Sequence, residues 1–556
     1  MTFDGRIQLF PMVRVALALM LGVVAGDALH GVVASWMWMG CMVVVLLLLL
    51  VWSACSKRLP IVVTVIARTI VVLLAVAVAG AWRMSVCADN IDMELPDGET
   101  TLCAVVAAVP PSGASAENAT ATSDGKPKTS RYELVVVGGY MSGHTIYAYF
   151  PADESVMAEN ARLNVGDGVE FSSRLRPAVA MSGALTIERN GSTHFNYARW
   201  LMVHDIVART YVAHGKWRRI AVGLQQLSGV QRLRLRLSVW RCGLLSTLRS
   251  SELSSTTYSV VAAMVFGDKR SLDGSLRDSY SVSGASHVLA LSGMHLSVIY
   301  VLLSLILARG RRQSYMQAAV LAAVWGYVVL VGMPPSVVRS ALMCTMFTLF
   351  SMLGRDRVSL NTLGLSAVLL LAFNPTSFWD VGFQMSFLAV AGILVIGERF
   401  GRIVPGKWLL EHRFVGWLWA MCIVSVSAQV MVAPLAAYYF GRFSSYFLLS
   451  NLVAVPLATA ILYSSVAMCA VMFVPCMLRV AVQVVDFEVS ALNDALRWIA
   501  SLPGASIENI KISGLQLLLV YVLIALVYAF SFYFEKAYRS AHGFRLEKYV
   551  RGRRGK

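Results

Sequence analysis

Residues 287–298 read HVLALSGMHLSV, and they lie where an apolar run becomes long enough to cross a membrane. Histidines, serines and a glycine interrupt this run, although a helix that only had to sit in lipid would need none of them. A buried polar group without a partner costs roughly 2 to 7 kcal/mol. The stretch therefore predicts a helix that breaks or bends at Ser292 and Gly293, so that His287 and His295 face a water-filled entry.

The composition of the whole chain places this stretch in a membrane protein. Of 556 residues, 57% are hydrophobic and only 14% are charged, against about 25% charged in soluble proteins. Runs of roughly 20 apolar residues cross a bilayer as helix, because a helix pairs its own backbone groups. We therefore expect a polytopic α-helical membrane protein of about 11–12 spans. The predicted spans are residues 13–29, 36–52, 61–82, 287–308, 316–332, 336–353, 360–373, 381–397, 415–439, 447–474 and 514–534, with 480–500 as a further candidate.

Charges between the spans predict the topology. Cytoplasmic loops carry an excess of Lys and Arg, and Arg14, Lys57 and Arg58 lie at the ends of the first three runs. The net charge of +17 has the same explanation. The first run has no convincing signal-peptide cleavage site, so we expect it to be retained. The N-terminus is then cytoplasmic and the segment after Trp82 external. If residues 480–500 cross the membrane, the basic C-terminal tail is cytoplasmic as well.

The segment after the third span changes character. Residues 87–205 contain period-two stretches such as YELVVV and HTIYAYF, separated by Gly, Pro and Asn. Such alternation is typical of strands with one buried face. Around five short strands in this length predict a small extracytoplasmic β-barrel of the OB type, with a β-sandwich as the alternative.

A basic segment follows the β domain. Between Ile206 and Ser251 there are nine Lys and Arg residues and no Asp or Glu. Leucines recur at about helical spacing, which predicts one or two basic amphipathic helices at the membrane surface. Anionic lipid headgroups are one partner for such a surface, and a nucleic-acid backbone is the alternative.

These boundaries divide the chain into five predicted parts. They are an N-terminal three-span region at 1–86, the β domain at 87–205, the amphipathic linker at 206–263, a helical bundle at 264–534 and a basic tail at 535–556.

Polar residues within the predicted spans gather toward the outer leaflet. Side chains of this kind face a cavity or the bundle interior and mark a pathway, and irregular backbone at that depth must be buried or line water. Taken singly, each has a simpler role, such as an interhelical hydrogen bond from Gln429 or a helix cap from Asp380. Taken together they predict a polar vestibule. Its candidate residues are His287, Ser292, Gly293, His295, Arg339, Asp380, Gln384, Gln429 and Asn451.

Known catalytic and metal-binding motifs do not occur in the sequence. LSGMH at 291–295 differs from the GxSxG nucleophile elbow, and there is no Walker or kinase motif. His287 and His295 are separated by about 80° around an ideal helix and have no supporting carboxylate, which argues against a metal site. Cys87 and Cys103, beside or within the β domain, are either free or joined by a disulfide. We expect no enzyme activity, no metal and no cofactor.

Residues 264–303 also resemble a known family. MVFGDKRSLDGSLRDSYSVSGASHVLALSGMHLSVIYVLL closely resembles the signature of the ComEC family, the inner-membrane DNA-uptake channels of bacterial competence. The likeness continues through GMPPSVVRSALM at 332–343, NPTSFWDVGFQMSFLAVAGIL at 374–394, APLAAYYFGRFSSYFLLSNLVAVPL at 433–457 and ALNDALRWIASLPGAS at 491–506. HFNYARWLMVHDIVARTYV at 194–212 resembles the family's exit from its OB-type external domain.

The resemblance implies import of single-stranded DNA through the inner membrane during natural transformation, with residues 264–534 as the channel bundle. Many members of the family add a C-terminal metallo-β-lactamase-like domain, linked to degradation of the other strand. This sequence stops at Lys556, so we expect that domain to be absent and a separate nuclease to act. The other expected partners are a DNA receptor outside, a cytosolic helicase or single-strand-binding proteins, and the lipid bilayer; homodimer formation is left open.

Candidate DNA contacts in the β domain combine cations with aromatic rings. Basic side chains attract phosphates and aromatic rings stack on bases. Period two places Tyr147 and Tyr149 on one face, so about half of the aromatics belong to the core. The candidates are Lys126, Lys128, Arg131, Tyr132, Tyr147, Tyr149, Arg162, Arg174 and Arg176.

Two other functions fit the same organisation. One is a small-molecule or ion transporter whose β domain is only structural, although no internal repeat typical of transporters is evident. The other is a partner-assembly module that the helical bundle anchors to the membrane.

Overall fold

The computed structural model describes residues 10–55, 61–93, 95–96, 98–109, 129–139, 141–151, 163–177, 197–307, 313–352, 360–471 and 474–554. The chain divides into two compact units. Among the described residues, those within 10–177, 197–387 and 444–505 form the first unit, and those within 388–443 and 506–554 form the second.

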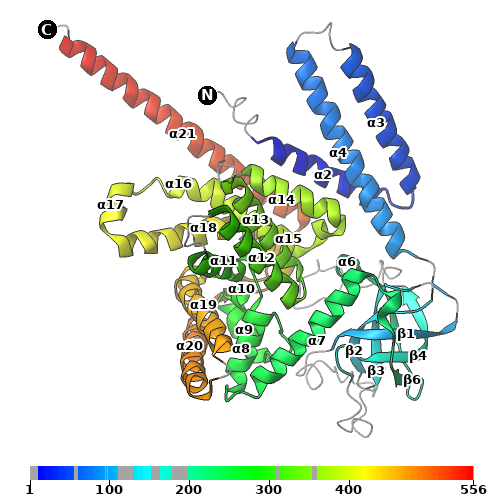
Figure 1. The fold of residues 1–556 in the computed structure, drawn as a ribbon. Coiled ribbons are helices and arrows are strands. Elements are labelled where there is room, and N and C mark those ends of the chain that lie inside the picture. Colours follow the sequence, from blue (N-terminus) through cyan, green and yellow to red (C-terminus); the bar gives the residue numbers. More distant parts are fainter. Residues whose placement is uncertain are drawn as a thin grey trace. The chain divides into compact units, whose positions relative to one another are not determined.

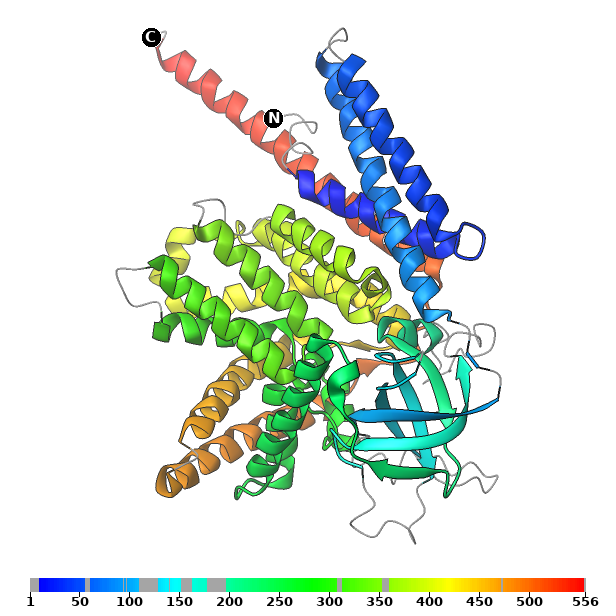
Figure 2. The ribbon, with the colours of Figure 1, turned by 45° about the vertical axis from the view of Figure 1, so that its right-hand side comes forward.

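Three apolar helices precede the β domain: α2 (Pro11–Ala28), α3 (Ser35–Cys55) and α4 (Ile61–Ile91). α2 lies directly on α4, since a Cβ on Gly22 would come 1.9 Å from the carbonyl oxygen of Ala77. Small residues of this kind let helices approach closely where lipid offers no hydrophobic driving force. α3 runs alongside α4 in both views (Figures 1 and 2) and buries almost none of its surface, as a lipid-facing helix does.

The β domain is a closed five-stranded barrel with a sixth strand appended (Figure 1). Its strands are β1 (Glu99–Ala108), β2 (Thr129–Val136), β3 (Thr145–Pro151), β4 (Gly168–Pro177), β5 (Ile206–Tyr211) and β6 (Trp217–Ile220). The strand order is β1-β2-β3-β5-β4, and β4 pairs back to β1. β3 and β5 are parallel, and the other pairings between described strands are antiparallel. This closed order fits the expected OB-like barrel and differs from a two-sheet sandwich.

Alternation along the strands builds the barrel interior. Leu134, Ile146 and Phe171 are fully enclosed there, and each such side chain contributes about 1.5–3 kcal/mol when removed from water. The packed interior thus stabilises the barrel, and the outward-facing strand positions can carry polar groups.

The barrel extends past residue 205, which differs from the expected boundary. β5 and β6 lie within residues 206–220, where the charge and leucine pattern predicts the start of a helical linker. The basic residues there are paired within the barrel: Arg218 with Glu170 of β4, and Arg219 with Asp167 at 2.5 Å. These two arginines therefore neutralise carboxylates that are distant in sequence. Only the later part of the basic segment is helical.

That later part is α7 (Gly229–Arg249), which begins at a capping box. The Ser228 side chain accepts a hydrogen bond from the backbone N–H of Gln231 at 3.3 Å, and the Gln231 side chain accepts one from the N–H of Ser228 at 3.2 Å. Leu235, Leu245 and Leu248 are buried while the arginines of the helix lie largely on other faces. α7 is therefore amphipathic, as the leucine spacing predicts.

Among the helices of the first unit, α8 (Ser255–Phe266) is almost entirely buried and packs against α7, α10 (Ser286–Leu289), α19 (Phe447–Ala470) and α20 (Pro475–Ser501). Further helices complete this unit. They are α6 (Tyr197–Val203), η2 (Leu224–Gln226), α9 (Gly274–Val282), α11 (Gly293–Leu307), α12 (Gln313–Val331), α13 (Pro335–Met352), α14 (Leu360–Phe373), η3 (Pro375–Trp379) and α15 (Val381–Gly392). α15 continues into the second unit. In the core, the Tyr280 hydroxyl donates to Asn493 Oδ1 at 2.8 Å, with both side chains buried.

The second unit is built on two long helices, α18 (Arg413–Phe440) and α21 (Gly514–Arg554). Its shorter elements are a π-helical turn η4 (Ile393–Gly397), α16 (Glu398–Phe400) and α17 (Gly406–Glu411), and two-residue strands β7 (Phe443–Ser444) and β8 (Ser506–Ile507) lie at its limits. Arg399 of α16 pairs with Glu535 of α21 at 2.9 Å. A Cβ on Gly392 would lie 2.4 Å from the carbonyl oxygen of Ser427, so α15 ends in close contact with α18.

Eight of the described helices are long and apolar enough to cross a membrane. They are α2, α3, α4, α13, the α15–α16 segment, α18, α19 and α21, and shorter apolar helices occur at α8, α11, α12 and α14. The candidate at 480–500 forms most of α20, whose buried Val485, Val489 and Leu492 lie on one face, as in an amphipathic helix. The chain is thus a multi-pass α-helical membrane protein with a small β-barrel domain.

Candidate functional site

The helix around HVLALSGMHLSV is interrupted where the sequence predicts. α10 ends at Leu289, Ala290 is extended at φ −91° and ψ 133°, and α11 begins at Gly293. Ser292 and His295 close the new helix start: the Ser292 N–H donates to Nδ1 of His295 at 3.2 Å, and the Ser292 hydroxyl lies 2.8 Å from the same nitrogen. The serine and histidine therefore supply partners for a helix terminus that would otherwise lack them.

Helix α13 holds this interruption in place. The Ser336 hydroxyl donates to the carbonyl oxygen of Leu291 at 2.8 Å. A Cβ on Gly293 would lie 2.6 Å from Ser340 Oγ, so the glycine lets the start of α11 rest on α13. Sequence reasoning missed Ser336 and Ser340; the signal was their spacing of four residues on the first turns of a polar-rich span.

An ion pair joins α13 to the start of α15. Arg339 Nη1 and Asp380 Oδ2 are 2.8 Å apart, with side chains only 5% and 22% exposed. Asp380 also accepts hydrogen bonds from the backbone N–H groups of Gly382 (3.2 Å) and Phe383 (3.0 Å). Asp380 therefore pairs with a cation and also caps the start of α15.

The turn before Asp380 is fixed by local hydrogen bonds. Asn374 Oδ1 accepts from the Thr376 N–H at 3.1 Å and begins η3. Gln384 Nε2 donates to the carbonyl oxygen of Phe378 at 2.9 Å and ties α15 back to that turn. A Cβ on Gly382 would lie 3.1 Å from Arg339 Nη2, so this glycine, also missed by sequence reasoning, leaves room for the ion pair.

Three of the candidate residues each have a buried polar atom without a hydrogen-bond partner among the described residues. These atoms are His295 Nε2, Arg339 Nε and Asn451 Oδ1. Since Nδ1 of His295 accepts the Ser292 N–H, Nε2 of the neutral ring carries the proton and is a donor. Buried donors without partners call for water or a ligand, so this region has unused hydrogen-bonding capacity.

The two histidines lie on either side of the break, His287 on α10 and His295 on α11. His295 is 1% exposed. That both face one water-filled entry stays a prediction. Asn451 lies on α19 of the same unit, and Gln429 lies half-buried on α18 of the second unit.

On the barrel, aromatic rings from β3, β5 and α6 stack on one another. Tyr149 and Tyr211 are parallel with centroids 4.7 Å apart, and Trp200 stacks on both Tyr147 (6.3 Å) and Tyr197 (5.7 Å). Burial and the neighbouring Tyr197 raise the pKa of Tyr149 to about 12, so its ring stays neutral at physiological pH. Tyr211 is 58% exposed and offers a free ring surface.

A small polar cavity of about 150 Å³ lies beside Tyr211. Arg174 and Arg176 of β4 and Lys216 line it together with the tyrosine. Lys216 is paired with Glu99 at 2.7 Å, whereas no ion pair joins Arg174 or Arg176 to a carboxylate in the described part of the chain. The cavity thus brings an exposed aromatic ring next to two arginines that remain available to an anion.

The other barrel candidates are placed as follows. Arg131 is exposed, with its guanidinium 4.8 Å from the Tyr147 ring centre. Tyr132 is removed from the candidates, because it is packed in the barrel core edge-on to Phe150 at 5.4 Å. The remaining three lie outside the described residues: Lys126, Lys128 and Arg162. Tyr211 and Lys216 were missed because they fall beyond the expected domain boundary.

Cysteine and metal chemistry add little. Cys87 and Cys103 are not bonded to each other in the structure. Among the described residues, no three His, Cys, Asp or Glu side chains gather closely enough to hold a metal ion.

Comparison with known proteins gives a consistent result. A family model described as "Competence protein" matches residues 264–532. The chain is 27% identical over 250 residues to ComE operon protein 3 of Bacillus subtilis (strain 168), covering 45% of this chain and 31% of that protein. It is 26% identical over 233 residues to competence protein ComA of Neisseria gonorrhoeae, covering 40% and 32% of the two chains. No solved structure matches it.

The fold and the polar helix break define a multi-pass membrane protein with a barrel domain and a polar core inside its helical region. The matched region contains both the α10–α11 interruption and the Arg339–Asp380 pair. Residues 264–532 match this competence-protein family model, and the similarity to the two relatives supports a ComEC-family competence protein. The chain spans about a third of the length of these two curated relatives.

Proposed function

We propose that this protein forms a channel that imports single-stranded DNA across the bacterial inner membrane during natural transformation. The observation that carries the proposal is the exposed ring of Tyr211 beside Arg174 and Arg176 on an OB-like barrel. Single-strand binders combine cations that follow the phosphates with aromatic rings on which bases stack. A transporter of small ions would have no use for this combination.

In the membrane region, the proposal uses the donors that lack partners. The strand carries one negative charge per nucleotide, and Arg339 supplies a buried cation whose Nε is not hydrogen-bonded within the described structure. His295 Nε2 is a second available donor. Phosphate oxygens fit both donors, whereas Asp380 keeps Arg339 in place and balances its charge while no strand is bound.

Orientation and partners follow from the same proposal. The barrel lies outside and the N- and C-termini are cytoplasmic, in keeping with the positive-inside rule. A DNA receptor and a separate nuclease deliver one strand from outside. A cytosolic helicase or single-strand-binding proteins draw the strand in, since the sequence has no recognisable motor motif.

Labelled DNA followed into the cytosol of a deletion strain tests the proposal. Complementation with the wild-type chain should restore uptake, whereas an Arg174→Gln/Arg176→Gln variant should restore it only weakly at equal membrane abundance. Glu99→Gln is the matched control, because it changes one charge of the same cavity and leaves both free arginines. Normal uptake in the deletion strain would refute the DNA-channel function.

The histidines give a second, finer test. His295→Ala should reduce uptake far more than His287→Ala, since His295 also closes the start of α11 through Ser292. Equal membrane levels of the two variants, measured by immunoblot, exclude loss of insertion. If neither variant changes uptake while removal of the barrel abolishes it, the partner-assembly alternative replaces the channel.

A further inference from the structure

The hairpin between α16 and α18 exposes large apolar side chains next to cations. Ile403, Leu410 and Phe414 are 65%, 78% and 73% exposed, and Lys407 and Arg413 are exposed beside them. Contact with water does not explain why these large apolar side chains are exposed beside cations. It is typical of segments at the boundary between lipid and water, where apolar groups enter the acyl region and cations stay near headgroups.

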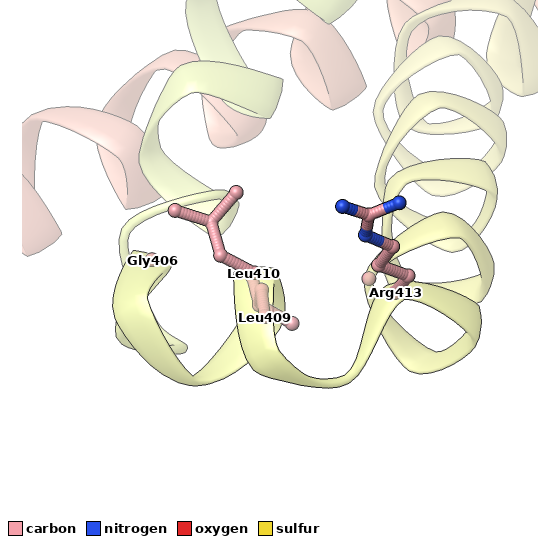
Figure 3. Close-up of a pocket in the computed structure, with 5 residues that line it drawn as sticks. Gly406, Leu409, Leu410 and Arg413 are labelled. Carbon is pink, nitrogen blue, oxygen red and sulfur yellow. The ribbon is translucent and has the colours of Figure 1, made fainter.

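An open groove of about 690 Å³ lies in this hairpin, lined by Gly406, Leu409, Leu410, Arg413 and Gly416. Figure 3 shows the side chains of Leu410 and Arg413 rising on the same side from the two arms of the hairpin. The arms approach closely because Gly416 has no side chain: a Cβ there would lie 2.9 Å from the carbonyl oxygen of Leu409. One wall of the groove is therefore aliphatic and the other carries a guanidinium.

Arg413 also marks the end of a membrane span. From Phe414 to Phe440, α18 contains no Asp, Glu, Lys or Arg. This uncharged segment is long enough to cross the hydrocarbon core. Trp408 and Trp417 flank the groove in sequence, and tryptophan is enriched at the membrane interface. The groove thus lies at the level of the lipid headgroups.

Arg413 differs from the nearby arginines in its ion pairing. Arg399 is paired with Glu535 and Arg402 with Glu398. Within the described residues no ion pair involves Arg413, although it is exposed. A phosphate is the complementary group, since a guanidinium can bind two of its oxygens at once.

From these observations we propose that the groove binds one anionic glycerophospholipid. Its phosphate contacts Arg413, and an acyl chain lies along Leu409 and Leu410. The site is independent of DNA transport and belongs to the second unit, so its failure would leave the proposed channel function unaffected.

Native mass spectrometry of the purified full chain can test the site. The protein is equilibrated with phosphatidylglycerol or with phosphatidylcholine of the same acyl chains, and the retained lipid is counted. The wild type should retain phosphatidylglycerol preferentially. Arg413→Gln should bind it about five-fold more weakly, as expected for one basic residue at the headgroup level, whereas Arg402→Gln, with the same change of charge in the same loop, should stay within about two-fold.

Leu410→Ser separates the apolar wall from the charge. Leu410 is exposed, so the substitution should not affect folding. It should weaken retention of both lipids and keep the preference for phosphatidylglycerol. Equal retention by Arg413→Gln and the wild type would overturn the site, as would a wild type without headgroup preference. Loss of oligo(dT) binding in Arg413→Gln with unchanged lipid retention would also overturn it, in favour of a nucleic-acid surface.

Discussion

The barrel surface and the helix break both present cations, but in opposite surroundings. On the barrel, Lys216 pairs with Glu99 with side chains 44% and 58% exposed. At the break, Arg339 and Asp380 form a pair of similar length that is almost closed off from solvent. An exposed pair contributes about 0–1 kcal/mol, whereas breaking a buried pair leaves a charge that nothing solvates. A Lys or Arg paired with a carboxylate therefore adds little stability on the barrel surface, whereas the buried pair at the helix break holds the fold in place.

Asp380→Ala should have the largest effect. It removes both the partner of Arg339 and the cap of α15, so we expect a loss of about 3–5 kcal/mol of stability and of DNA uptake. Thermal unfolding of the purified protein measures the first effect and transformation frequency the second. Glu99→Ala, which breaks the exposed barrel pair, should cost no more than about 1 kcal/mol. Equal losses in the two variants would remove the distinction between the regions.

A double variant separates stability from function at the same pair. Arg339→Met/Asp380→Ala removes both charges, so it should recover much of the stability lost in Asp380→Ala, because no charge is left unpaired. Uptake should remain low, since the buried cation is gone. Recovery of uptake together with stability would show that the pair is purely structural.

Gly382→Ala should have an intermediate effect. The new methyl group would crowd Arg339 Nη2 at 3.1 Å and Asp380 Oδ2 at 3.2 Å, and such overpacking costs about 1–3 kcal/mol. Gly326 of α12 is the control, because a Cβ there meets nothing within 4 Å. Gly326→Ala should be neutral or stabilising by up to about 1 kcal/mol. Both variants are compared by thermal unfolding.

Tyr211→Ala should weaken DNA binding without lowering stability. Removing one stacking ring should cost about 1–3 kcal/mol of affinity for a single strand, measured by fluorescence anisotropy with oligo(dT). Tyr315 of α12 is also exposed, at 75% against 58% for Tyr211, and Tyr315→Ala should leave the affinity unchanged. A similar loss in both variants would mean that the binding is not located at the barrel cavity.

The smallest effect is expected from Arg176→Gln. Each phosphate contact contributes about 0.7 to the slope of log K against log salt for single strands, so the slope should fall by about that amount. Arg497→Gln, at an exposed site on α20, should leave the slope unchanged. An unaltered slope in Arg176→Gln would exclude a phosphate contact by this residue.

Local sequence patterns predicted the positions where helices are interrupted or begin. Ser292 and Gly293 predicted the break before α11, and Asp380 predicted a helix cap, because polar groups in apolar runs need partners wherever they lie. The barrel strands were likewise visible as period-two alternation. The end of the barrel was misplaced, since Arg218 and Arg219 suggest a basic helix until Glu170 and Asp167 are seen opposite them.

Other features depended on contacts between distant segments. The sequence around Leu291 does not show that the Ser336 hydroxyl donates a hydrogen bond to the Leu291 carbonyl oxygen. Nor does it show that Gly382 makes room for Arg339. Sequence also grouped His287 with His295, but only the structure shows that Ser292 bonds the ring of His295 and closes the start of α11.

By itself the sequence determined that this chain is a multi-pass membrane protein with a small β-barrel, since hydropathy and alternation follow directly from the solvent each residue must face. Only the tertiary structure decided which polar groups meet. It paired Arg339 with Asp380 across 41 residues, left His295 Nε2 and Arg339 Nε unpartnered among the described residues, and set Tyr211 beside Arg174 and Arg176. The physical reason is that hydrogen bonds and ion pairs act over a few ångströms, and chain order does not fix those distances.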